Sequence, residues 1–158
     1  MALWFTLTCH AAALAYGLLG GIFLAFSDFV MRALGDTPGA GGIAAMQQIN
    51  RAVYRAVFMM IFMGMVPVSL AIAIYAWITQ GSEGWPFVVA GVVYVVFCFA
   101  TTAAFNVPMN TALDRLPAAQ AEGYWRDVYL PRWTAWNSLR TLACAGAAVA
   151  MVWGLATR

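Results

Sequence analysis

The stretch YRAVFMMIFMGMVPVSLAIAIYAWIT, residues 54–79, has no charged residue after Arg55 and decides the fold class. An α-helix needs about 20 apolar residues to cross the roughly 30 Å of hydrocarbon in a bilayer, and this stretch is long enough. Three more apolar runs of similar length lie at residues 8–33, 86–107 and 135–156. The chain is therefore predicted to be an all-α integral membrane protein, a bundle of four transmembrane helices.

The composition supports this prediction. The chain has 158 residues, of which 64% are hydrophobic and 9% charged, far from the balance of soluble proteins. We expect one membrane domain over residues 1–158, because the sequence shows no linker, repeat or low-complexity stretch. Helical spacing begins at Ile43, so the second helix is expected to span residues 43–79, with its membrane part from residue 54. The net charge of +2 does not favour a nucleic-acid partner.

The arginines give an expected orientation. The chain has eight arginines and no lysine. Those near the loops after the first and third helices are Arg32, Arg51, Arg55, Arg115, Arg126, Arg132 and Arg140. Only Arg158 lies at the other end. Positive charge collects on the cytoplasmic side, so these two loops are expected there and both termini on the non-cytoplasmic side. A bacterial inner membrane is the expected location.

Small residues recur every fourth position in the first and last helices. They are Ala13, Gly17, Gly21, Ala25 and then Gly146, Ala150, Gly154. Such ladders let helix backbones approach closely, since lipid supplies no hydrophobic drive for association. We interpret them as packing within the bundle, in preference to the alternative of a homo-oligomer joined through these faces.

Two charged residues are predicted to lie within the membrane near the cytoplasmic end. Counted along the helix, Asp28 and Arg140 are each about two turns inside. A charge at that depth costs at least about 2.5 kcal/mol unless it has a partner or water. We expect the two to pair across the bundle, with Arg32 or Arg55 as competing partners for Asp28.

Amides, aromatic residues and one further arginine at the same end complete a candidate polar pocket. They are Asn50, Arg55, Asn106, Asn110, Trp133, Trp136 and Asn137. Polar side chains that converge from four helices favour a ligand or substrate site. The alternative is structural: such amides can simply join helices, and such tryptophans can form an interfacial aromatic belt. Cys9, Cys98 and Cys144 form no close-spaced metal motif, and His10 has no second strong ligand at its depth except the neighbouring Cys9, so no metal or cofactor is expected.

Four stretches resemble a known family. GGIFLAFSDFVMRAL (20–34), GIAAMQQINRAVYRAVF (42–58), FNVPMNTALDRL (105–116) and YLPRWTAWNSLRTL (129–142) are similar to the small four-helix membrane proteins of the anthrone oxygenase-like family. The most specific pieces are MQQINR at 46–51, NVPMN at 106–110 and RWTAWNSLR at 132–140. Many members of that family carry His where this chain has Ser138.

The resemblance implies oxidation of a flat, lipophilic aromatic (an anthrone or a similar quinol) by molecular oxygen, without flavin or metal. In that interpretation Asp28 is the candidate base and Arg140 a candidate catalytic donor to the substrate oxyanion. The amides would assist Arg140, and a tryptophan would stack on the rings. The alternative is a non-enzymatic membrane protein that binds a lipid, a quinone or another hydrophobic molecule. A small transporter subunit is a third possibility, less favoured because no inverted repeat is evident.

Overall fold

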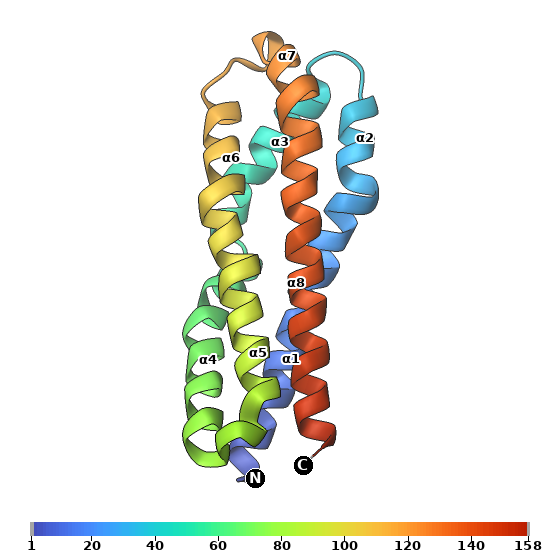
Figure 1. Cartoon of the computed structure of the whole chain (residues 1–158). Coiled ribbons are helices and arrows are strands. Elements are labelled where there is room, and N and C mark those ends of the chain that lie inside the picture. Colours follow the sequence, from blue (N-terminus) through green and yellow to red (C-terminus); the bar gives the residue numbers. More distant parts are fainter. Residues whose placement is uncertain (1, 158) are drawn as a thin grey trace.

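The computed structural model describes residues 2–157, and within them all regular structure is helical. Arg158, on which part of the orientation argument rests, lies outside the described residues. Four long helical rods run side by side along the molecule (Figure 1). The rods comprise α1 Leu3–Ala25 continued by η1 Phe26–Val30 and α2 Met31–Asp36; α4 Val57–Gln80; α5 Trp85–Val93 continued by η4 Tyr94–Ala100, η5 Thr102–Asn106 and α6 Val107–Asp114; and α7 Glu122–Tyr124 continued by η7 Trp125–Tyr129 and α8 Leu130–Ala156.

By length and composition, three helical segments in residues 2–157 are able to cross a membrane: Leu3–Asp36, Val57–Asp114 and Glu122–Ala156. The second of them folds back on itself at η3 Gly81–Gly84, so α4 and α5 lie side by side as separate rods (Figure 1). The turn needs a glycine, because Gly81 has φ 60° and ψ −138°, a conformation unfavourable for residues with a Cβ. The all-α prediction is confirmed, and the apolar segments are consistent with an integral membrane protein.

Both ends of the chain lie at the same end of the bundle, and α3 lies at the opposite end (Figure 1). Apolar side chains cover the outside of the rods: Met60 and Ile78, for example, are 75% and 74% exposed. Inside, one cluster of buried apolar residues fills the half near the termini, around Tyr16, Phe87 and Met151. A second cluster fills the other end. The exposed apolar surface and the buried core thus occupy opposite faces of the same helices, an arrangement consistent with an integral membrane protein.

The second predicted helix, residues 43–79, is interrupted, which corrects the sequence prediction. Two shorter elements, α3 Gly41–Ala52 and η2 Val53–Arg55, precede α4. Ala56, between η2 and α4, is extended at φ −89° and ψ 151°. The buried face of α3, including Ile43 and Met46, packs on the cluster at the end of the bundle. The buried face of α4 packs on the other cluster, the one in the half of the bundle near the termini. One straight helix cannot present a face to both clusters, so the chain breaks between them.

The two glycines in the small-residue ladder of the first helix face open space, which corrects the packing interpretation at those two positions. A Cβ added at Gly17 or Gly21 would meet no atom within 4 Å. The close approach is made by Gly20 instead, where an added Cβ would lie 3.1 Å from the Cβ of Cys144 on α8. In the last helix, Gly154 does pack closely, since a Cβ there would lie 2.8 Å from the Phe87 ring.

Gly91 on α5 lies at a close crossing with α4, and its replacement by Ala tests the packing. The added Cβ would lie 2.7 Å from the backbone oxygen of Ser69, which cannot move without shifting α4. We expect Gly91→Ala to lower the free energy of unfolding by about 1–3 kcal/mol. Gly64→Ala is the matched control, because its Cβ meets nothing within 4 Å. Thermal unfolding in one detergent measures both, and equal stability of the two variants would contradict this packing.

Candidate functional site

A cavity of about 360 Å³ lies among the rods, toward the end that α3 covers. Its wall is mainly apolar and draws on the first, second and third rods, on α3 with η2, and on α8. The lining residues are Ile22, Phe23, Phe26, Met46, Ile49, Val53, Tyr54, Phe58, Met59, Phe62, Met63, Phe99, Thr102, Ala103, Val107, Asn110, Trp133, Asn137 and Arg140. The volume falls within the range of small-molecule sites, and few of the lining groups are polar.

Arg140 is the one charged residue in this lining. Its side chain is buried, with 5% of the residue exposed. One guanidinium nitrogen, Nη2, donates to Oδ1 of Asn137 at 2.7 Å, and Nη1 donates to Oγ1 of Thr102 at 3.3 Å. The guanidinium carbon lies 4.4 Å from the centre of the Phe23 ring and 5.3 Å from that of Trp133. Two aromatic faces and two neutral acceptors thus support the cation.

No carboxylate neutralises Arg140 within residues 2–157, where the ion pairs are Arg32–Asp28, Arg51–Asp114 and Arg126–Glu122. In the same part of the chain, Nε of Arg140 is buried and has no hydrogen-bond partner. An uncompensated buried charge is costly, and buried polar groups nearly always find partners. A buried cation at the wall of an apolar cavity is therefore suited to bind an anionic or strongly polarised oxygen of a ligand.

Asn137, which lies on α8 like Arg140, connects Arg140 to the first rod. Its Nδ2 donates to the backbone oxygen of Phe23 and to Oγ of Ser27, both at 2.6 Å, which leaves Oδ1 to accept from Arg140. Ser138, next along α8, has its Oγ 3.0 Å from Oγ of Ser27. The bonds to α1 and η1 thus fix the orientation of the Asn137 amide. The amide in turn fixes the position of the Arg140 guanidinium.

A second amide, Asn110, lies in the cavity wall on α6. Its Oδ1 accepts from Nε1 of Trp133 at 2.7 Å and from the hydroxyl of Tyr129 at 2.8 Å. Asn50 of α3 donates to the same hydroxyl at 3.3 Å. Asn106 is buried behind the wall, and its Nδ2 donates to the backbone oxygen of Trp133 at 3.3 Å. These bonds fix the position of the Trp133 indole, which lines the cavity.

Of the nine predicted site residues, four line the cavity, and Asn50 and Asn106 join the hydrogen bonds behind its wall. The other three lie elsewhere, and the expected pairing of Asp28 with Arg140 is wrong. The Asp28 side chain is 68% exposed and its carboxylate lies 3.8 Å from Arg32. It is absent from the cavity lining, as are Arg55, which is exposed, and Trp136. Trp136 instead stacks on Phe105, with ring centres 3.9 Å apart.

The displacement of Asp28 has a local cause. Residues 26–30 form a π-helical segment, η1, which holds more residues per turn than an α-helix and so rotates the faces that follow. The residue brought toward α8 is Ser27, and Asp28 turns outward. The third rod has π-helical segments of its own, η4 and η5, and these carry the lining residues Phe99, Thr102 and Ala103. Such segments are frequent at functional sites.

Sequence reasoning missed four contributors: Phe23, Ser27, Thr102 and Tyr129. A signal existed for Thr102, which precedes Asn106 by four residues and so shares its helix face. Tyr129 is fully buried and bridges Asn50 to Asn110. Phe23 is indistinguishable in sequence from the other apolar residues of the first helix.

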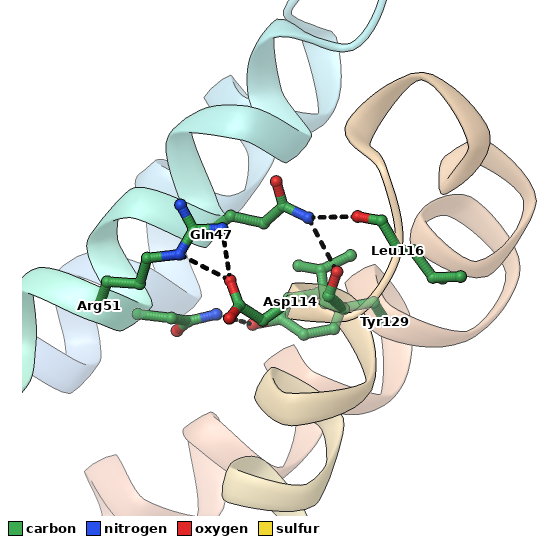
Figure 2. A network of polar contacts seen from close by, with 7 residues as sticks. Gln47, Arg51, Asp114, Leu116 and Tyr129 are labelled. Carbon is green, nitrogen blue, oxygen red and sulfur yellow. Dashed lines mark hydrogen bonds and ion pairs between the residues drawn. The ribbon is translucent and has the colours of Figure 1, made fainter.

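Two side chains of α3 bond to the end of α6 and hold α3 against the third rod (Figure 2). Nε2 of Gln47 donates to the backbone oxygens of Leu113 and Leu116, each at 2.8 Å, at the end of α6. Arg51 reaches Asp114 at 2.7 Å. Because α3 also supplies Met46 and Ile49 to the cavity, this attachment keeps one wall in place.

Gln47 is expected to stabilise this attachment more than Arg51 does. Gln47→Ala leaves the Leu116 carbonyl without its donor and removes one of the two donors to the Leu113 carbonyl, at a cost of about 1–3 kcal/mol. Arg51→Ala removes an ion pair whose side chains are 52% and 43% exposed. Solvent screens such pairs, so we expect that variant to lose less than about 1 kcal/mol. Thermal unfolding of both variants measures the order, and a larger loss in Arg51→Ala would contradict the assignment.

The fold and the cavity together define a class: an all-α protein with membrane-type helices around an apolar cavity that contains one buried cation. The chain belongs to the anthrone oxygenase family, whose family model matches residues 51–150. This match confirms the resemblance found in the sequence. The matched range contains Thr102, Asn110, Trp133, Asn137 and Arg140 but not Asp28. Searches of curated proteins and of solved structures gave no significant match.

Proposed function

We propose that this chain is an integral membrane oxygenase that oxidises a flat, lipophilic aromatic molecule with molecular oxygen, without a resident cofactor. The carrying observation is the unneutralised guanidinium of Arg140 in the wall of an apolar cavity. Membership of the anthrone oxygenase family supports the oxygenase activity. The cavity volume of about 360 Å³ supports a substrate of a few fused rings.

The proposed topology has four membrane crossings. The two termini lie at one end of the bundle and the arginine-rich loops at the other, which under the positive-inside rule faces the cytoplasm (Figure 1). Part of the cavity wall is open toward the surroundings of the rods, since Ile22, Tyr54 and Met63 line it and are 42%, 60% and 50% exposed. A lipophilic substrate would therefore enter directly from the bilayer.

In the proposed reaction an anthrone-like substrate first loses a proton to solvent and becomes an anthrolate. Its oxyanion lies against Arg140, with the rings on Trp133. The anthrolate passes an electron to O₂, the two radicals join, and the proton returns to give a hydroperoxide. Cleavage of the O–O bond and of the C–H bond at the same carbon releases water and leaves a ketone. One substrate and one O₂ give one quinone and one water, so no external reductant is needed.

Asp28 was our candidate base, and the structure offers no geometric support for that role. Its carboxylate is exposed and lies beside Arg32. We therefore expect Asp28→Asn to keep at least about half of the wild-type turnover, because the general-base contribution of a real catalytic base is about 100-fold or more. Initial rates of quinone formation measure this. A loss of that size would restore Asp28 as the base.

Oxygen consumption by the purified protein in lipid nanodiscs tests the proposed activity. Anthrone is the probe, and the amount of anthraquinone formed is compared with the amount of O₂ consumed. The proposal predicts a one-to-one ratio and a rate well above that of empty nanodiscs, which corrects for spontaneous oxidation of anthrone. A rate equal to that of empty nanodiscs would contradict it for this substrate class.

A non-enzymatic binder of a quinone, a lipid or another hydrophobic molecule is the second candidate. One observation favours it: no carboxylate or imidazole is among the cavity-lining residues, so a general base is not evident there. Native mass spectrometry and an absorption spectrum of the detergent-purified protein separate the two candidates. A tightly retained aromatic molecule together with no oxygen consumption would favour binding alone.

A further inference from the structure

Two cysteines from different rods meet inside the bundle, away from the cavity lining. Sγ of Cys98 in η4 lies 3.5 Å from Sγ of Cys144 in α8, close enough for a thiol hydrogen bond. Both thiols are free and fully buried. Neither belongs to the wall of the cavity, and the proposed oxygenation makes no use of them. Their contact is therefore a separate chemical feature.

The surroundings permit the sulfurs to join. A disulfide brings its sulfurs to about 2.05 Å, so the pair needs only a small further approach. Cys98 lies in the π-helical segment η4, not in a regular α-helix. On α8, Gly20 of the first rod packs directly against Cys144 and leaves no room for the helix to retreat. The approach is thus expected to come from the side of Cys98.

Burial limits which oxidant can reach the pair. Both residues are 0% exposed, so bulky thiol reagents and protein disulfide catalysts are excluded from the folded protein. Hydrogen peroxide is small and crosses membranes. Oxidation of one thiol to a sulfenic acid is expected to be slow, because susceptibility rises with thiolate character and exposure and both thiols are fully buried. The thiol already in contact then displaces water from the sulfenic acid.

We propose that Cys98 and Cys144 form a redox-active dithiol that reduces hydrogen peroxide and becomes an interhelical disulfide. The peroxide O–O bond breaks, an S–S bond forms, both thiol protons pass to the oxygens, and two waters leave. The two sulfurs are oxidised and the two peroxide oxygens are reduced. The proposal does not rest on the proposed oxygenase activity.

The position of the dithiol relates it to the cavity. Cys98 precedes Thr102 by four residues, and the Thr102 hydroxyl donates to the Cys98 carbonyl at 2.8 Å. Cys144 follows Arg140 by four residues, one helical turn. A disulfide would therefore cross-link the two rods one turn away from the Arg140–Thr102 contact.

Peptide mapping of the peroxide-treated protein in nanodiscs tests the proposal. After treatment the protein is denatured, free thiols are alkylated, and the mass and peptides are analysed. We expect an intact mass lower by about 2 Da, a cross-linked Cys98–Cys144 peptide, and alkylation of Cys9 alone. Cys9 is the internal control, because it is equally buried and free but no hydrogen bond joins it to another thiol.

Variants sharpen the test. Cys98→Ser and Cys144→Ser should each abolish the mass loss, whereas Cys9→Ser should keep it. Because a serine variant of a buried cysteine can fail to fold, the wild-type peptide map decides the question independently. Three alkylated cysteines after peroxide, a disulfide that includes Cys9, or addition of oxygen to the sulfurs without a cross-link would each overturn the proposal.

Discussion

Replacement of Arg140 by Gln is expected to lower the turnover of an anthrone about 100- to 1,000-fold, the usual loss when one oxyanion donor is removed. The buried guanidinium supplies the only positive charge in the cavity wall, and Gln keeps hydrogen-bonding ability without charge. Initial rates of quinone formation in nanodiscs measure the effect. The turnover of Arg140→Lys should lie between those of the wild type and Arg140→Gln. Lysine keeps the charge but loses the planar guanidinium that donates to Asn137 and Thr102.

Arg55→Gln is the matched control for Arg140→Gln. Arg55 was a predicted binding residue, yet it is exposed and outside the cavity lining, so we expect its replacement to leave turnover unchanged. Equal losses in the two variants would show that positive charge at this end of the bundle, and not Arg140 in the cavity, is what matters. Unfolding temperatures of both proteins separate loss of function from loss of fold.

Ala103→Trp is expected to abolish ligand binding by filling the cavity. Ala103 lies in the cavity wall, and an indole there would take a large share of the 360 Å³ available to a substrate. We expect the affinity for an anthraquinone product to fall at least about 100-fold, which corresponds to about 2.7 kcal/mol. Fluorescence or absorption titration in nanodiscs measures it.

Ala104→Trp is the control for the cavity-filling variant. The two alanines are adjacent on the same rod and both are exposed, but only Ala103 lines the cavity. A tryptophan there faces the surroundings of the bundle and should leave the affinity within about twofold of wild type, a difference of only a few tenths of a kcal/mol. If both variants bind normally, the ligand site lies elsewhere.

The four rods could be predicted because their signal is local. Each apolar run is long enough to be a membrane helix by itself, whatever its neighbours do. The break at Ala56 could not be predicted, since the sequence around it contains neither Pro nor Gly. It arises because α3 and α4 pack on different clusters, which is a property of the assembled bundle.

The candidate site was predicted in part for a similar reason. The depth of Arg140, counted from the end of its apolar run, indicated a buried charge, and Asn137 and Trp133 share its face at helical spacing. Asp28 was misplaced because the π-helical turn at residues 26–30 changes that spacing, and nothing in the sequence FSDFV signals such a turn. Trp136 was misplaced because the rotation of α8, which decides which tryptophan faces inward, depends on its packing partners.

The most direct measurement is the ionisation of a hydroxyanthraquinone dye bound to the protein. The probe 1,8-dihydroxyanthraquinone changes colour when a phenol group ionises, so an absorption titration reports the pKa of the bound dye. If Arg140 stabilises a ligand oxyanion, wild-type protein should lower the pKa of the dye relative to empty nanodiscs, and Arg140→Gln should not. Equal pKa values of the dye in wild-type protein and in Arg140→Gln would contradict the central role of Arg140.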